Sequence, residues 1–230
     1  NAIKLSKGEN LKMKIKRYTI TENNQINKNY LEKYIMENNI SQNEIPKIQI
    51  ERPSEIIVFY NEHEKAGSLN LWHNRPNYNG KATSYIGNVN ILEKYRKNET
   101  EIFNQIFENL KKEGIETIIG PLNGTTWNTY RYVTDKGHRS PFLMEPWNED
   151  YYVELFEKLG FKPLAYYIST VMENMNPVQR GHLSKKIEKL KKFEYYRDTT
   201  VKSAENEDLI AVLNKVYDLT IEAFKNNFLY

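Results

Sequence analysis

The stretch from Gly114 to Phe161 most constrains what this chain can fold into. It begins with an apolar, β-branched run over residues 115–122, which fits a buried strand better than a helix. A polar, aromatic loop of about 25 residues follows, which is longer than most connections in compact domains. The loop carries too many apolar side chains for a disordered segment: Trp127, Tyr130, Tyr132, Phe142, Leu143, Met144 and Trp147. We therefore expect an ordered, functional loop.

The residues around this stretch predict alternating strands and helices. Strands are expected over residues 11–20, 55–61, 68–74 and 83–92, and helices over 26–38, 98–110 and 148–159. Pro46 and Pro53 bracket a connection, Gly87 indicates a bulge in its strand or a close backbone approach, and Gly114 ends the second helix. Residues 161–172 complete the pattern as a strand or hairpin that closes the sheet. This order predicts an α/β or α+β domain with a mixed sheet over residues 11–175.

Composition excludes several classes of protein. The chain has no cysteine, which rules out disulfides, thiolate metal sites and a cysteine nucleophile. A net charge of +3 is too small to indicate nucleic acid, and no apolar run reaches the length of a membrane span. The four histidines lack metal-ligand spacing. We expect a soluble, cytoplasmic protein that uses no metal and binds neither nucleic acid nor membrane.

The order of elements resembles the GNAT superfamily of acyl-CoA-dependent N-acyltransferases. The shared features are a bulged strand feeding a helix, a further strand, and a short helix ending at Leu159-Gly160-Phe161. The sequences IIGPLNGTTWNTYRYVT and PFLMEPWNEDYYVELFEKLGF are similar to a bacterial subgroup with a G-P-x-N-G element. The resemblance implies a mixed, mostly antiparallel central sheet flanked by helices. It also implies acetyl-CoA, or another acyl-CoA, as cosubstrate, without a metal.

The same resemblance implies where the coenzyme binds. The bulged strand would supply backbone groups to the pantetheine, and the next helix would hold the pyrophosphate at its N-terminus, where free N–H groups point outward. The residues concerned are Asn88, Val89, Asn90, Ile91, Arg96, Lys97, Asn98 and Thr100. This sequence departs from the family because the KNETE segment has no glycine. Glu99 and Glu101 in the first turn would repel phosphate, and Arg96 and Lys97 partly compensate.

Three residues are candidates for acid–base chemistry. The family's usual acid is a tyrosine four residues before the L-G-F glycine, and Phe156 stands there in this sequence. Tyr151 and Tyr152, one turn earlier, are either substitute proton donors or packing residues. Glu145 is either a general base, because apolar neighbours raise a carboxyl pKa, or a turn cap or ion-pair partner of an arginine.

The long loop supplies candidate substrate-binding residues beside the conformationally free Gly124. These residues are Asn123, Thr126, Trp127, Tyr130 and Arg131, for which a plain turn is the alternative interpretation. The expected acceptor is a small-molecule amine or a peptide amine. A basic linker helix over 180–192, a strand over 193–200 and a helix over 205–226 are expected in residues 176–230. The last of these helices carries an apolar stripe that is expected to face a core. That region is either the start of a second, truncated GNAT-like repeat or a surface that packs on another subunit of a homodimer.

Two functions from different classes remain. The first is an N-acetyltransferase that transfers an acyl group directly to an amine. The second is a catalytically silent GNAT-like module that binds a ligand or partner through the aromatic loop, which the altered phosphate segment and Phe156 favour. Binding of single-stranded nucleic acid is a weaker third interpretation, because basic and aromatic residues do not cluster together.

Overall fold

The structure is a computed structural model that describes residues 13–22, 25–97, 99–143, 145–170, 181, 185–186, 188–189, 192, 203 and 207–224. The chain divides into two compact units, with the boundary between Lys162 and Pro163. The first unit contains the sheet and the long loop, and the second contains a C-terminal helix.

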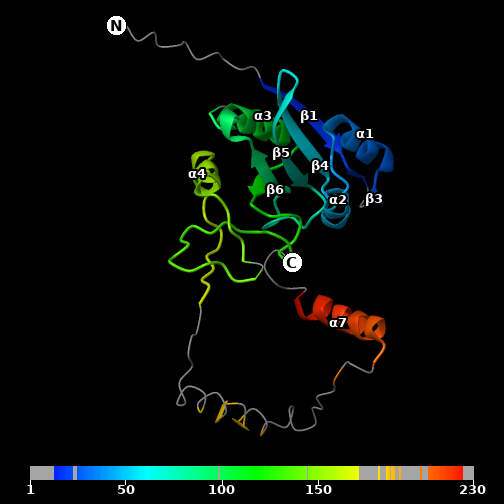
Figure 1. The fold of residues 1–230 in the computed structure, drawn as a ribbon, viewed down its shortest axis with the longest axis vertical. Helices are drawn as coiled ribbons and strands as arrows, with labels where there is room; N and C mark the ends of the chain where they lie inside the picture. The colour runs from blue at the N-terminus through cyan, green and yellow to red at the C-terminus, as the bar shows by residue number, and fades with distance from the viewer. Residues whose placement is uncertain are drawn as a thin grey trace. The chain divides into compact units, whose positions relative to one another are not determined.

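The first unit is built on a sheet of five strands (Figure 1). In spatial order these are β1 (Met13–Thr19), β4 (Glu55–Asn61), β5 (Glu64–Trp72), β6 (Thr83–Ile91) and β7 (Thr117–Ile119). Neighbouring strands are antiparallel except β6 and β7, which are parallel and joined by a helical crossover. A separate pair comprises β2 (Thr21–Glu22) and β3 (Gln25–Ile26). The predicted mixed, mostly antiparallel central sheet is confirmed.

Helices cover both faces of the sheet. They are α1 (Lys28–Asn38), α2 (Ile45–Glu51), the 3₁₀ turn η1 (Glu93–Tyr95), α3 (Glu99–Lys112) and α4 (Asp150–Lys158). Strand β4 explains this layering, because successive side chains on a strand point to opposite faces. Ile57 and Phe59 are buried with apolar residues of α3 and α4, whereas Ile56 and Val58 are buried with those of α1 and α2. The apolar stripe of α3 is buried at Ile102, Phe103, Ile106 and Leu110 and half-buried at Phe107.

Two expectations are corrected within the first unit. Residues 161–170 form no strand, and the end of the expected strand, 171–172, lies outside the described residues. Pro163 has no N–H to give to a ladder, so the expected strand is interrupted near its start. The connection expected between Pro46 and Pro53 contains α2, which Pro46 initiates from within its first turn.

The second unit contains α7 (Leu209–Phe224), which confirms the predicted C-terminal helix. Its apolar stripe was expected to face a core, yet none of its residues is buried. That expectation is wrong for the described chain, because no other element of the described residues covers the stripe. The expected helix over 180–192 lies largely outside the described residues, and the expected strand over 193–200 lies wholly outside them.

Candidate functional site

The candidate site begins where β6 and β7 part. The two strands pair from Thr83 with Thr117 to Tyr85 with Ile119, and one further bond runs from the Leu122 N–H to the Ile86 carbonyl, at 2.9 Å. Beyond Ile86, no described strand pairs with β6 on that side, although β6 continues to Ile91. The Leu92 N–H donates to Ala66 on β5, so by strand alternation the backbone of Ile91 faces the open side.

A bulge in β6 creates this divergence. The register with β5 slips between Ser68 and Asn70, and Asn88 adopts a left-handed backbone with φ of 47°. Gly87 allows the neighbouring loop to approach, since a Cβ there would lie 2.2 Å from the Asn123 side-chain oxygen. The bulge predicted from Gly87 is therefore present, with the strained position one residue later.

Polar side chains join β6, α2 and the start of the long loop at this bulge. Asn88 donates its backbone N–H to Oδ1 of Asn123 at 2.9 Å, and Nδ2 of Asn123 donates to Oδ1 of Asn88 at 2.7 Å. The Nδ2 group of Asn88 donates to the carboxylate of Glu51, and Lys47 donates to Oδ1 of Asn88 at 3.2 Å. Asn123, a sequence-predicted substrate residue, thus lies beside Asn88, a sequence-predicted coenzyme residue.

Glu51 is the member of this network that the sequence interpretation missed. Its side chain is 6% exposed, and burial raises the pKa of its carboxyl, an effect that Lys47 and Asn88 partly oppose. A signal existed in the sequence: Pro46 favours a helix start, and Glu51 follows the apolar Ile48 by three residues, which places both on one helical face. A carboxylate held this way is suited to accept a proton.

Arg96 lies between the end of β6 and the start of α4. Its Nε donates to the carbonyl of Ile91 at 3.4 Å, its guanidinium stands 4.0 Å from the ring centre of Tyr151, and it pairs with Glu149 at 2.8 Å. The hydrogen bond to Glu149 raises the pKa of Arg96, and the same bond lowers the pKa of Glu149. The cation beside the end of β6 is therefore already paired with a carboxylate.

The N-terminus of α3 differs from an ordinary phosphate site. Glu99 in the first turn is 3% exposed, and its Oε1 accepts from Lys158 at 2.9 Å. Within the described residues, Oε2 of Glu99 and the buried hydroxyl of Thr100 have no hydrogen-bond partner. Lys97 is exposed, and Asn98, with its expected capping role, lies outside the described residues. A carboxylate thus occupies the helix end where phosphate was expected.

The two candidate tyrosines differ in their surroundings. Tyr152 stacks on Tyr132, with ring centres 6.0 Å apart. The hydroxyl of Tyr151 is buried and makes no hydrogen bond with any residue that the structure describes. Burial, with a further contribution from the charge of Glu99, raises the pKa of Tyr151. Tyr151 therefore holds its proton and has no acceptor for it in the described chain.

The remaining predicted residues lie along the loop. Glu145 pairs with Arg131 at 3.5 Å, which is the ion-pair alternative left open by the sequence. Tyr130 packs against the buried cluster of Trp72, Tyr85 and Leu122. Thr126 is half-buried and Trp127 is 61% exposed. Of the predicted acceptor residues, only Asn123 makes a hydrogen bond to the bulge of β6 in the described chain.

The described residues offer neither a metal-binding cluster nor a helix that could span a membrane. No group of three or more histidine, aspartate or glutamate side chains in the described chain could hold a metal ion. No helix within the described ranges combines the length and apolar character that a membrane span requires.

Comparisons with known proteins give only distant likenesses. No protein-family profile and no curated protein matches the chain. Three solved structures similar to 70% of this chain are a transcriptional regulator from Bacillus halodurans C-125, an aminoglycoside acetyltransferase from an uncultured soil metagenomic sample, and glucosamine-6-phosphate N-acetyltransferase from Arabidopsis thaliana. In that order, their sequence identities to this chain are 15%, 14% and 12%, and the matches cover 99%, 97% and 99% of their own chains. The TM-scores are 0.40, 0.40 and 0.37. Likenesses this weak assign neither family nor activity.

Proposed function

We propose that this chain is an acyl-CoA-dependent N-acyltransferase of the GNAT type, which transfers an acetyl group directly to an amine. The observation that carries the proposal is the open side of β6 between its bulge and Arg96. An extended amide chain such as pantetheine can pair with such a strand edge as another strand would. The strand edge ends at Arg96, whose guanidinium matches phosphate geometry.

Three side chains are suited to the proton transfers of this reaction. Attack on a thioester requires a neutral amine, and the departing thiolate requires a proton. Glu51, buried beside the bulge, is suited to take the proton from the amine. Tyr151, whose buried hydroxyl has no hydrogen-bond partner in the described chain, is the candidate to supply the proton to the thiolate. Asn123 holds the bulged backbone of Asn88 in place and is a positioning residue.

The acceptor in this proposal is a small-molecule amine or a peptide amine, and the protein acts in the cytoplasm. In the aromatic loop that follows Asn123, Tyr130 packs against the cluster of Trp72, whose indole N–H donates to the Glu51 carbonyl, and Trp127 is 61% exposed. An acyl-CoA supplies the activated carbonyl, and the residues of this chain bind, orient and exchange protons with it.

The coenzyme phosphates must compete with Glu149 for Arg96. Because the Arg96–Glu149 pair is only partly buried, with side chains 21% and 59% exposed, a phosphate can replace the carboxylate at modest cost. Glu149→Gln should therefore strengthen binding of CoA, and Arg96→Gln should weaken it by about tenfold or more through the lost charged hydrogen bonds.

Calorimetric titration with CoA and acetyl-CoA tests the proposal. Wild type is compared with Arg96→Gln, Glu149→Gln and the control Glu157→Gln, which makes the same charge change at an exposed position of α4. The proposal predicts micromolar binding in the order Glu149→Gln, then wild type and Glu157→Gln, then Arg96→Gln. It is abandoned if neither ligand gives heat and the melting temperature stays unchanged at millimolar ligand.

A second function has its own observation. Glu99 fills the N-terminus of α3 and is held there by Lys158, which favours a catalytically silent module of this fold. In that case the aromatic loop binds a ligand or partner and the coenzyme does not bind. The same titration separates the two functions.

A further inference from the structure

The sheet ends in an open strand edge at β7. This strand is the last in the spatial order, and among the described residues nothing pairs with its outer side. The Thr117 N–H donates to Ala82 at 3.1 Å, so by strand alternation the N–H and carbonyl of Ile118 point outward. An exposed edge of this kind pairs readily with another extended segment.

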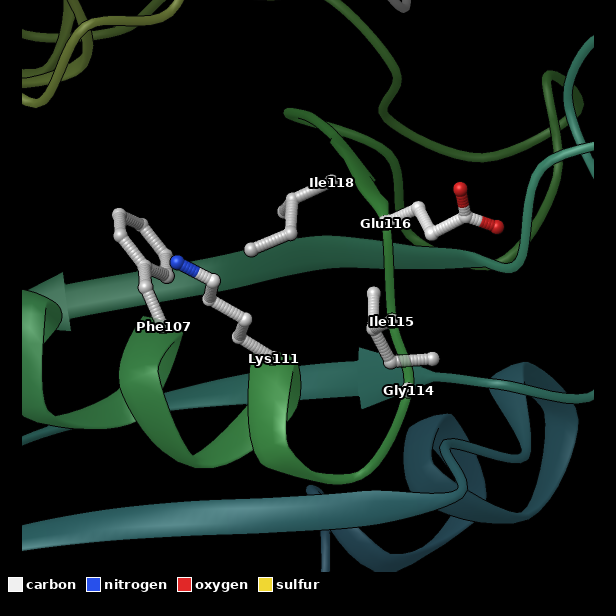
Figure 2. A pocket seen from close by; sticks show the side chains of 6 residues that line it. All are labelled: Phe107, Lys111, Gly114, Ile115, Glu116 and Ile118. Atoms are coloured by element: carbon white, nitrogen blue, oxygen red, sulfur yellow. The ribbon is translucent and has the colours of Figure 1, made fainter.

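A hollow of about 380 Å³ adjoins this edge. It is lined by Phe107, Lys111, Gly114, Ile115, Glu116 and Ile118. Figure 2 shows the side chains of Phe107 and Lys111 rising from α3 toward the segment that carries Ile115 and Ile118. The lining is therefore mostly apolar, and it includes one positively charged side chain, Lys111, and one negatively charged side chain, Glu116. Such a surface accepts an extended segment with apolar side chains on one face.

The chain itself contains a segment of that kind. Residues 164–168 read Leu-Ala-Tyr-Tyr-Ile, a β-prone run in which Leu164, Tyr166 and Ile168 recur with the period of a strand. Tyr166 is 84% exposed and Ile168 is 89% exposed, although both are large and apolar. The run forms no strand in the described chain. An exposed apolar run and an open strand edge are complementary surfaces carried by one sequence.

The segment follows, after two residues of sequence, a side chain that contacts the lining of the hollow. Phe161 packs edge-on against Phe107, with ring centres 6.0 Å apart, and Phe107 lines the hollow. Only Lys162 and Pro163 separate Phe161 from Leu164. Pro163 disfavours a helical turn at Lys162 and holds the connection extended. Short connections that resist folding back favour exchange of the segment between two copies of a chain.

We infer that two copies of this chain form a dimer by strand exchange, in which residues 164–170 of each copy add to the edge of β7 of the other. Tyr166 and Ile168 then lie over the hollow beside Phe107 and Ile118. The contact is reciprocal, as a two-fold dimer requires. The inference is independent of the proposed function, since it uses none of the residues of the candidate site.

Light scattering on the full chain at micromolar concentration tests the oligomeric state. Wild type should have the mass of two chains, and the double variant Tyr166→Asp with Ile168→Asp should have the mass of one. Because both residues are exposed, the variant should keep its helical signal and melting transition. The matched control, Leu213→Asp with Val216→Asp, places the same charges on the exposed stripe of α7 and should remain dimeric.

Cross-linking through introduced cysteines identifies the contact. Because the chain has no cysteine of its own, a thiol reagent reacts only with the introduced ones. A tagged chain carrying Glu116→Cys is mixed with an untagged chain carrying Tyr167→Cys and treated with a short bismaleimide. A tagged–untagged conjugate is expected, and the Tyr166→Asp, Ile168→Asp background should abolish it.

Three results would overturn the inference. These are a monomeric wild type, a dimer that only the α7 variant dissociates, and a mixture of the two cysteine variants that forms no tagged–untagged conjugate.

Discussion

The side chain of Asn123 replaces a missing strand for Asn88: it accepts the Asn88 backbone N–H at 2.9 Å and donates to the Asn88 side chain at 2.7 Å. Backbone groups at a bulge lose their ladder partners, so this pair supplies what β7 no longer provides. It also fixes the point at which the two strands part.

Replacing Asn123 with alanine should therefore cost stability. Asn123 is 5% exposed, so the loss leaves the Asn88 N–H with no partner inside the protein. We expect a decrease of about 1–3 kcal/mol in the free energy of unfolding, measured by urea denaturation. Asn90→Ala on the exposed neighbouring position of β6 is the control, and an equal loss in both variants would argue against a special role for Asn123.

Gly87→Ala should be more damaging than a glycine substitution in open space. The added Cβ would lie 2.2 Å from Oδ1 of Asn123 and 2.7 Å from the carbonyl of Leu122, so the loop would have to move. Overpacking of this kind costs about 1–3 kcal/mol. Gly181→Ala, where nothing lies within 4 Å, serves as the control for thermal denaturation. Equal melting temperatures would contradict the close approach.

Glu51→Gln should raise stability at neutral pH. Burial raises the pKa of Glu51, so the folded chain binds its proton more tightly than the unfolded chain does. The stability of wild type therefore falls as pH rises through this raised pKa, whereas glutamine keeps the acceptor for Asn88 without a charge. We expect a higher melting temperature for the variant at pH 7 and no difference near the ordinary carboxyl range of about pH 4. A constant difference at every pH would contradict this assignment.

Tyr151→Phe should separate activity from stability. The hydroxyl has no hydrogen-bond partner in the described chain, so its removal should leave the melting temperature unchanged or slightly higher. If the hydroxyl protonates the leaving thiolate, kcat for acetyl transfer should fall by about 100-fold. Tyr152→Phe, whose ring is stacked on Tyr132, is the control and should keep its rate. Equal rates in both variants would remove Tyr151 from the mechanism.

Lys158→Met should destabilise the chain, because it leaves the buried Glu99 without its cation. The side chain of Lys158 is 55% exposed, whereas that of Glu99 is 4% exposed. We therefore expect a moderate decrease of about 1–2 kcal/mol in the free energy of unfolding, measured by urea denaturation. Adding Glu99→Gln to the same chain should restore most of that stability. Failure of the double variant to recover would show that Lys158 acts by packing instead.

Much of the first unit could be predicted from the sequence because its patterns are local. The stripe of α3 through Ile102, Phe103 and Ile106 repeats with helical spacing, and Gly114, with φ of 88°, ends that helix. The continuous β-prone run of β4 is typical of a strand that is covered on both faces. The bulge at Gly87 was predictable because an isolated glycine in a strand indicates one.

The parts that could not be predicted depend on contacts far apart in the sequence. Glu51 is buried because Asn88 and Trp72, neither near it in sequence, converge on α2. The period of residues 161–172 predicts a strand, but a strand forms only where it pairs with a neighbour, and residues 161–170 join no strand of the described chain. In α7 the apolar stripe predicts that one face of the helix is buried, but the sequence does not indicate which segment would cover that face.

The Arg96–Glu149 pair joins residues 53 positions apart and closes a loop that contains α3, β7 and the whole aromatic segment. Closing a loop of this length has an entropic cost that a weak ion pair offsets only in part. A phosphate that binds Arg96 would break the Arg96–Glu149 ion pair and release Glu149, which precedes the first turn of α4. Ligand binding would then be coupled to the order of the loop that surrounds the acceptor, so that high salt and coenzyme loosen the same segment.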